Sequence, residues 1–169
     1  MKEIRMYFIG FDLNNAMATD HQRSFIIELS EMIGHYDFPL LAVDKTKITY
    51  EIDKNGDYLK VSLPHRNDES FDLWVAIYDA EAIVFFGNAH QHFEGNEWIL
   101  KTVSFIIKIL HGKLEIHTFY KEKKIISMKT YFVNDSGNRE FLSSKKFFSL
   151  ELYNPFIKTR EEIKRTSFQ

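Results

Sequence analysis

The segment 97–111 restricts the fold more than any other, because most of its positions carry large apolar side chains. Its polar residues recur at intervals of four and three, which draws one narrow polar stripe down a helix. Asn96 can cap the start of this helix, and Gly112 can end it. A helix that is apolar around most of its circumference has to be deeply buried. We therefore expect residues 97–111 to form the central core helix.

Hairpin signals dominate the rest of the chain. Two alternating runs, 46–53 and 58–63, flank Asn55-Gly56, and this dipeptide favours the type I′ turn because both residues tolerate positive φ. A second hairpin is predicted from the runs 114–120 and 125–133. The other expected elements are a short strand over 3–11, a helix over 20–34 capped by Thr19 or Asp20 and ended by Gly34, strands over 71–78 and 82–86, and a last strand or bulged pair within 140–153.

These elements predict an α+β fold. The expected architecture is a largely antiparallel twisted sheet, built from hairpins and packed against two main helices at about 20–34 and 97–111. The length of 169 residues fits a single domain over 1–169. Asn154-Pro155 interrupts the last strand, so we expect residues 154–169 to form a short charged helix or a frayed tail.

Composition excludes several classes of protein. The chain has no cysteine, which rules out disulfides, thiolate metal sites and cysteine catalysis. Its N-terminus lacks the pattern of a signal peptide, and Lys101 and Lys108 interrupt the most apolar helix, so no membrane span is expected. No nucleophile elbow, phosphate-binding glycine loop or dinucleotide fingerprint is present, so no catalytic residue and no cofactor is predicted. We expect a cytoplasmic protein.

Charge is distributed very unevenly along the chain. Residues 1–100 contain 8 Lys/Arg and 17 Asp/Glu, whereas residues 101–169 contain 14 and 7. The overall charge of −2 is therefore the sum of a net charge of −9 on the acidic portion, residues 1–100, and +7 on the basic portion, residues 101–169. Such asymmetry concerns partners and association rather than fold. Attraction between the acidic portion of one subunit and the basic portion of another would produce a homo-oligomer, which is one alternative for the role of this asymmetry.

The acidic portion suggests a protein-binding surface. Exposed carboxylates on hairpins and connectors would steer a basic protein partner toward the chain. The residues predicted to form this surface are Glu51, Asp53, Asp57, Asp68 and Glu69. The leading hypothesis is therefore a non-enzymatic binding module, such as an immunity-type or inhibitor protein. The opposing interpretation is that acidic turns only keep edge strands from aggregating.

Two other hypotheses involve different residues. His90, His92 and Glu94 alternate on an extended segment and could bind zinc or iron in a metal-dependent enzyme, with Glu115 and His117 as complementary ligands. Alternatively, the basic C-terminal hairpins could hold single-stranded nucleic acid between lysines and aromatic rings. The residues of that second surface are Lys121, Lys123, Lys124, Lys129, Lys145, Lys146, Tyr120, Tyr131, Phe147 and Phe148.

Overall fold

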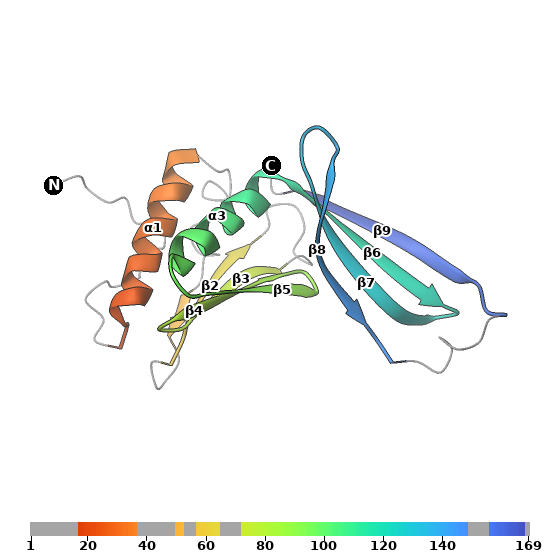
Figure 1. Ribbon diagram of the computed structural model, residues 1–169, viewed down its shortest axis with the longest axis horizontal. Helices are drawn as coiled ribbons and strands as arrows, with labels where there is room; N and C mark the ends of the chain where they lie inside the picture. The colour runs from red at the N-terminus through yellow and green to blue at the C-terminus, as the bar shows by residue number, and fades with distance from the viewer. Residues whose placement is uncertain (1–16, 37–49, 53–56, 65–71, 149–155, 168–169) are drawn as a thin grey trace. The chain divides into compact units, whose positions relative to one another are not determined.

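The computed structural model describes residues 17–36, 50–52, 57–64, 72–148 and 156–167 (Figure 1). They form two helices and two antiparallel sheets, of five and four strands. The predicted α+β class, with a largely antiparallel sheet, is confirmed. The chain divides into two compact units, residues 1–110 with 168–169 and residues 111–167. The expectation of one domain stays a prediction, and the strand expected over 3–11 lies outside the described residues.

Helix α1 (Asp20–Tyr36) begins with a reciprocal capping box. The Gln22 amide N–H donates to the Thr19 hydroxyl, and the Thr19 N–H donates to the Gln22 side-chain oxygen, at 3.2 and 3.0 Å. Thr19 is therefore the N-cap. The predicted end at Gly34 is wrong, because the helix continues to Tyr36. The apolar face of α1 is fully buried and consists of Phe25, Ile26, Leu29 and Ile33.

The first sheet is a meander in which each strand pairs with the next along the chain. Its order is β1 (Tyr50–Ile52), β2 (Leu59–Pro64), β3 (Asp72–Ile77), β4 (Glu81–Phe86) and β5 (Ala89–Glu94). Side chains alternate between the two faces of the sheet, and one face supplies the core. The buried residues on that face include Leu59, Val61, Leu63, Leu73, Val75, Ile77, Val84 and Phe86. Each such side chain contributes roughly 1.5–3 kcal/mol through removal from water.

Both helices lie on one side of this sheet (Figure 1). Phe105 of α3 (Trp98–His111) contacts Phe86 and Phe93, with ring centroids 5.5 and 5.2 Å apart. Gln22 of α1 donates to the carbonyl of Ile77 at 3.2 Å. The predicted core helix is confirmed, since α3 buries seven of its residues along the segment and ends before Gly112. Neither described helix is long and apolar enough to cross a membrane.

Strand β5 was predicted only as an extended segment before the core helix. Its sequence, AHQHFE, lacks an apolar alternation, because an edge strand needs few buried side chains. Strand β4 was expected to be covered on both faces. It alternates instead, with Ala82, Val84 and Phe86 buried and the residues between them half-buried.

The second sheet contains four antiparallel strands in the order β8-β7-β6-β9. The hairpin of β6 (Lys113–Lys121) and β7 (Lys124–Val133) matches the prediction. Strand β8 (Arg139–Lys146) pairs with β7 across a bulge between Thr130 and Tyr131.

Strand β9 (Thr159–Ser167) corrects the prediction for residues 154–169. Within this segment, residues 159–167 form a nine-residue strand that pairs with β6 from Lys113↔Ser167 to Lys121↔Thr159. This strand carries charged residues on both faces, so its sequence lacks the alternation of apolar and polar residues that predicts a strand. The cause of the strand is tertiary, because the open edge of β6 offers backbone partners for the whole segment.

Candidate functional site

Alternation along the second sheet gathers a distinctive set of side chains on one side. The register places Tyr131 and Arg165 opposite Glu115, and Lys129 and Ile163 opposite His117. Phe141 lies opposite Tyr131 and Arg139 opposite Val133, so both share this side of the sheet. We call this side the Glu115 face; its members are Glu115, His117, Phe119, Lys129, Tyr131, Arg139, Phe141, Lys146, Glu161, Ile163 and Arg165.

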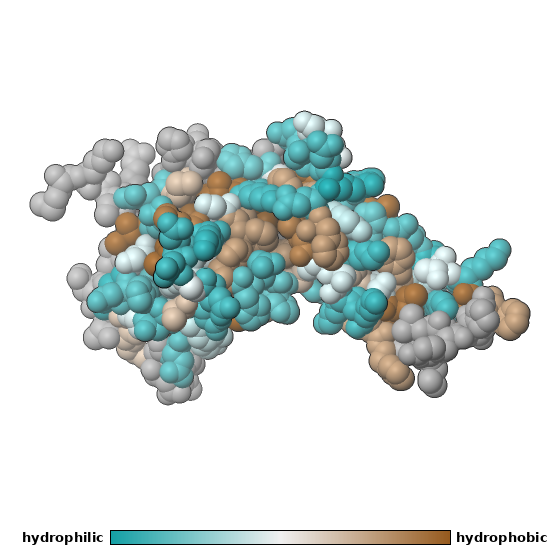
Figure 2. All heavy atoms as spheres, in the orientation of Figure 1, coloured by the Kyte–Doolittle hydropathy of each residue, from teal (hydrophilic) through white to brown (hydrophobic). Residues whose placement is uncertain are grey.

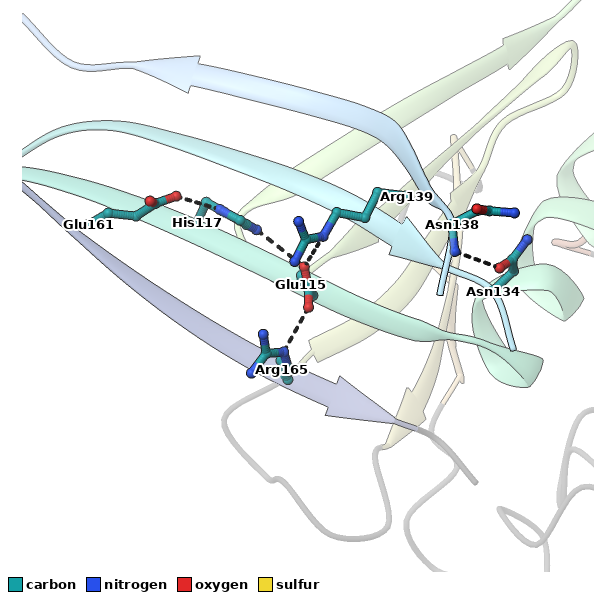
Figure 3. Close-up of polar contacts among 7 residues, drawn as sticks. All are labelled: Glu115, His117, Asn134, Asn138, Arg139, Glu161 and Arg165. Carbon is teal, nitrogen blue, oxygen red and sulfur yellow. Dashed lines mark hydrogen bonds and ion pairs between the residues drawn. The ribbon is translucent and has the colours of Figure 1, made fainter. Parts of the chain in front are cut away.

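Glu115 lies at the centre of this face and is almost completely buried, at 5% exposed. Arg139 and Arg165 each donate from Nε, to Oε2 at 2.6 Å and to Oε1 at 2.7 Å (Figure 3). His117 Nε2 lies 3.3 Å from Oε2. One buried carboxylate therefore holds side chains from three strands.

These donors set the ionisation of the carboxylate. The hydrogen bond from Arg165 lowers the pKa of Glu115 most, while burial acts in the opposite direction and raises it. Hydrogen bonds from Arg139 and His117 lower the pKa further, to about 2. Glu115 is therefore ionised at neutral pH and is too weak a base for proton abstraction.

His117 lies between two carboxylates. Its Nδ1 is 2.5 Å from Glu161 Oε1, on the side opposite its contact with Glu115 (Figure 3). Carboxylate oxygens only accept hydrogen bonds, so both contacts are hydrogen bonds only when both ring nitrogens carry a proton. Among the described residues, the hydrogen-bond partners of Glu115 and His117 lie in the second sheet, and their predicted role as complements to His90 and His92 stays a prediction.

The loop 134–138 positions Arg139 at the start of β8. The Asn138 N–H donates to the Asn134 side-chain oxygen at 2.9 Å, and Gly137 adopts a φ of 79°. This loop forms a hydrophilic projection in Figure 2. Its tight closure fixes where β8 begins and so brings Arg139 to Glu115.

Aromatic rings continue from the charged centre toward the β8 edge. The centroids of His117 and Tyr131 are 4.9 Å apart and those of Tyr131 and Phe141 are 5.8 Å apart, both edge to face. Phe141 is 56% exposed. Lys129 Nζ lies 5.4 Å from the ring centre of Phe119. An edge-to-face row does not use both faces of every ring, so aromatic surface stays accessible to a ligand.

A contrasting aromatic group lies on the outer face of the first sheet. Trp74 and Phe85 are direct cross-strand partners and stack at 3.7 Å with an interplanar angle of 6°. Lys60 Nζ lies 4.9 Å from the Trp74 ring centre, and His90 lies on the other side of Phe85 at 5.6 Å. Neighbours on both sides of this stack leave less ring surface open to a ligand, and the cross-strand pair contributes to the stability of the sheet.

The lysines and aromatic residues that were predicted to share one surface are divided between the two faces of the second sheet. Lys129, Lys146 and Tyr131 belong to the Glu115 face by register, whereas Tyr120 and Lys145 belong to the opposite face. There Arg160 covers the Tyr120 ring at 4.8 Å, and Lys145 lies 5.2 Å from the Phe147 ring centre. Arg139 and Arg165 were not predicted as site residues, because only the pairing registers of β8 and β9 reveal that they share a face with Glu115.

The described part of the predicted acidic surface consists of Glu51 and Asp57. Glu51 is exposed on β1 opposite Lys60, and Asp57 is exposed before β2. Asp53, Asp68 and Glu69 lie outside the described residues.

The predicted metal ligands lie on β5. His90 and His92 are exposed, with ring centroids 5.3 Å apart, and His92 Nδ1 is 3.9 Å from Glu81 Oε2. Glu94 lies opposite Glu81 on the same face of the sheet. Among the residues that the structure describes, no group of three or more histidine or acidic side chains is arranged to hold a metal ion. The metal site stays a prediction.

Formal charge follows the division into units. Residues 1–110 with 168–169 carry 10 Lys/Arg and 17 Asp/Glu, whereas residues 111–167 carry 12 and 7. The unit that contains the Glu115 face is therefore basic, at +5. No protein family model, curated protein or solved structure matches this chain.

Proposed function

We propose that this protein is a binding module, not an enzyme, and that the Glu115 face binds single-stranded nucleic acid. The observation that carries the proposal is the pair of arginines held by one buried carboxylate beside an accessible aromatic row. Single-strand binding surfaces combine cations that track the phosphate backbone with rings on which bases stack.

The individual groups suit these two tasks. Phe141 and Tyr131 offer aromatic surface to bases, and stacking on a ring is worth roughly 1–3 kcal/mol per base. Lys129, Arg139 and Arg165 supply positive charge from β7, β8 and β9 of the same sheet. An exposed sheet face that combines rings and cations is also a common platform for single-stranded RNA.

Fluorescence anisotropy with a labelled single-stranded 12-mer tests the proposal. Arg165→Ala removes a cation from the Glu115 face, and Arg160→Ala removes the same residue type from the opposite face of the same strand. We expect Arg165→Ala to weaken binding by about tenfold and Arg160→Ala to change it by less than about twofold. Equal effects of the two variants, or no saturable binding at low salt, would refute the proposal.

A basic protein partner is the second candidate, because the hairpin carboxylates Glu51 and Asp57 are exposed within the acidic unit. An inhibitor or immunity-type role in the cytoplasm is the specific form of this proposal. The test is capture of partners from a cytoplasmic lysate by the intact chain, compared with a variant that has alanine at Glu51, Asp53, Asp57, Asp68 and Glu69. A protein bound by the intact chain and lost in the variant supports this candidate, and unchanged capture contradicts it.

A further inference from the structure

The two arginines around Glu115 use only part of their hydrogen-bonding capacity. The side chains of Arg139 and Arg165 are 51% and 67% exposed, although the carboxylate that they share is buried. Toward the part of the chain that the structure describes, each guanidinium donates one hydrogen bond, from Nε. A guanidinium has five N–H donors in a planar fork. The terminal N–H groups are therefore available to a ligand.

The buried carboxylate restricts the positions of both guanidinium groups. Arg139 bonds to one carboxylate oxygen and Arg165 to the other, so the groups flank Glu115 from β8 and β9 (Figure 3). A pre-oriented guanidinium loses less conformational freedom when it binds an anion than a freely rotating side chain does. The Nε donors are sufficient to satisfy the buried carboxylate, and the exposed remainder of each guanidinium is not required for that task.

The charge balance indicates what kind of anion fits. Arg139, Arg165 and Glu115 together carry a formal charge of +1, and the neighbouring Glu161 and Lys129 of the same face cancel each other. A phosphodiester carries one negative charge and presents two oxygens that match a guanidinium fork. A terminal phosphate carries close to two negative charges at neutral pH and would overcompensate the site.

We infer that Arg139 and Arg165 form a clamp for one backbone phosphodiester, with Glu115 as the positioning residue that holds both guanidinium groups. The nucleic-acid ligand in this inference rests on the function proposed above, whereas the phosphodiester chemistry is testable without it. Glu115 itself does not touch the ligand in this arrangement.

The first experiment compares lysine substitutions, which keep the charge and remove the fork. We expect Arg139→Lys and Arg165→Lys each to weaken binding of a 5′-hydroxyl 12-mer by about tenfold, and Arg160→Lys by less than about twofold. Glu115→Gln should also weaken binding, provided that circular dichroism shows an intact fold. Full affinity in both single lysine variants would overturn the clamp.

The second experiment identifies the phosphate that is bound. A 5′-phosphate should leave the affinity unchanged, whereas methylphosphonate linkages, which remove backbone charge, should abolish the difference between wild type and Arg165→Lys. A gain in affinity that requires the 5′-phosphate would overturn the assignment to the backbone.

The third experiment separates the clamp from the proposed function. Titration of the whole protein with dimethyl phosphate should shift the Nε–H NMR signals of Arg139 and Arg165, assigned through the lysine variants, but not that of Arg160. Such shifts without oligonucleotide binding would refute the proposed function and keep the clamp. Absence of shifts in the tens of millimolar would overturn the clamp, even if oligonucleotides bind.

Discussion

At the residue scale, Glu115 acquires its properties from side chains that are far away in sequence. Its partners Arg139 and Arg165 lie 24 and 50 residues further along the chain. Burial of a carboxylate is costly, and these hydrogen bonds offset the cost. Neutralising Glu115 would leave the Arg139 and Arg165 guanidinium groups close together without the carboxylate that both of them bind.

The low pKa of Glu115 predicts how stability depends on pH. Its pKa is about 2 in the folded protein, compared with 4.5 for an unperturbed glutamate. Between these values the unfolded chain binds more protons, so stability rises with pH. The contribution of Glu115 is complete above about pH 4.5 and is lost as the pH falls toward 2.

Urea unfolding between pH 2 and 7 measures this contribution, which amounts to at most about 3 kcal/mol. Glu115→Gln should be less stable than wild type at pH 7, and the difference should shrink as the pH falls. A difference that stays constant over the whole range would show that Glu115 contributes no titrating stabilisation.

Ser30 of α1 provides a second test at this scale. Its hydroxyl is buried and has no hydrogen-bond partner among the described residues. Ser30→Ala should raise the free energy of unfolding by up to about 1 kcal/mol, because it removes an unsatisfied polar group and improves helix propensity. The matched control is Thr102→Val, since the Thr102 hydroxyl is buried but donates to the Trp98 carbonyl at 2.7 Å. That variant should be destabilised, and a loss of stability in Ser30→Ala would contradict the prediction.

At the scale of secondary structure, the junction between α3 and β6 depends on Gly112. A Cβ atom at this position would lie 1.9 Å from the Phe132 ring on β7. Gly112→Ala should therefore destabilise the protein by about 1–3 kcal/mol. The double variant Gly112→Ala/Phe132→Leu should recover part of the loss, as measured by urea unfolding. Additive effects of the two substitutions would exclude the steric explanation.

Truncation to alanine should affect stability differently in the Trp74–Phe85 stack and in the Tyr131–Phe141 row. Trp74 is stacked on both sides in the first sheet, whereas Phe141 is exposed at the edge of the aromatic row. We expect Trp74→Ala to cost about 2–4 kcal/mol of stability. Phe141→Ala should cost less than about 1 kcal/mol but should weaken oligonucleotide binding. Urea unfolding and anisotropy on both variants measure this, and equal stability losses would argue that the Phe141 row is also structural.

The helices and strands differ in how clearly the sequence predicts them. Helix α3 and the β6–β7 hairpin were predicted because one has a clear helical period and the other has two alternating runs around a turn. Strands β5 and β9 lie at sheet edges and carry few buried side chains, so their hydrophobic pattern is weak. Pairing with a neighbouring strand, not local preference, determines that these segments are extended.

At the scale of the whole molecule, the opposed charges belong to different units, −7 in one and +5 in the other. The net charge of −2 gives little long-range attraction to nucleic acid, so the proposed binding would depend on local contacts of the Glu115 face.

This dependence predicts a shallow response to salt. Contacts of Lys129, Arg139 and Arg165 with about three phosphates give a slope of roughly −2 for log affinity against log salt concentration on a single strand. Anisotropy titrations over a range of potassium chloride concentrations measure the slope. A slope near zero would contradict phosphate contacts, and a much steeper one would require cations outside the Glu115 face.

Sedimentation velocity at the same salt concentrations would detect any homo-oligomer held by the opposed charges.

By itself the sequence determined the α+β class, both helices and most hairpins, because hydrophobic period and turn chemistry are local properties. It also revealed the division of charge. The candidate site was decided only by the tertiary structure. Glu115, Arg139, Glu161 and Arg165 meet because the four strands β8, β7, β6 and β9 pair in specific registers. A one-residue shift of β9 against β6 would turn Glu161 and Arg165 to the other face, and no local pattern in the charged strand β9 specifies which register forms.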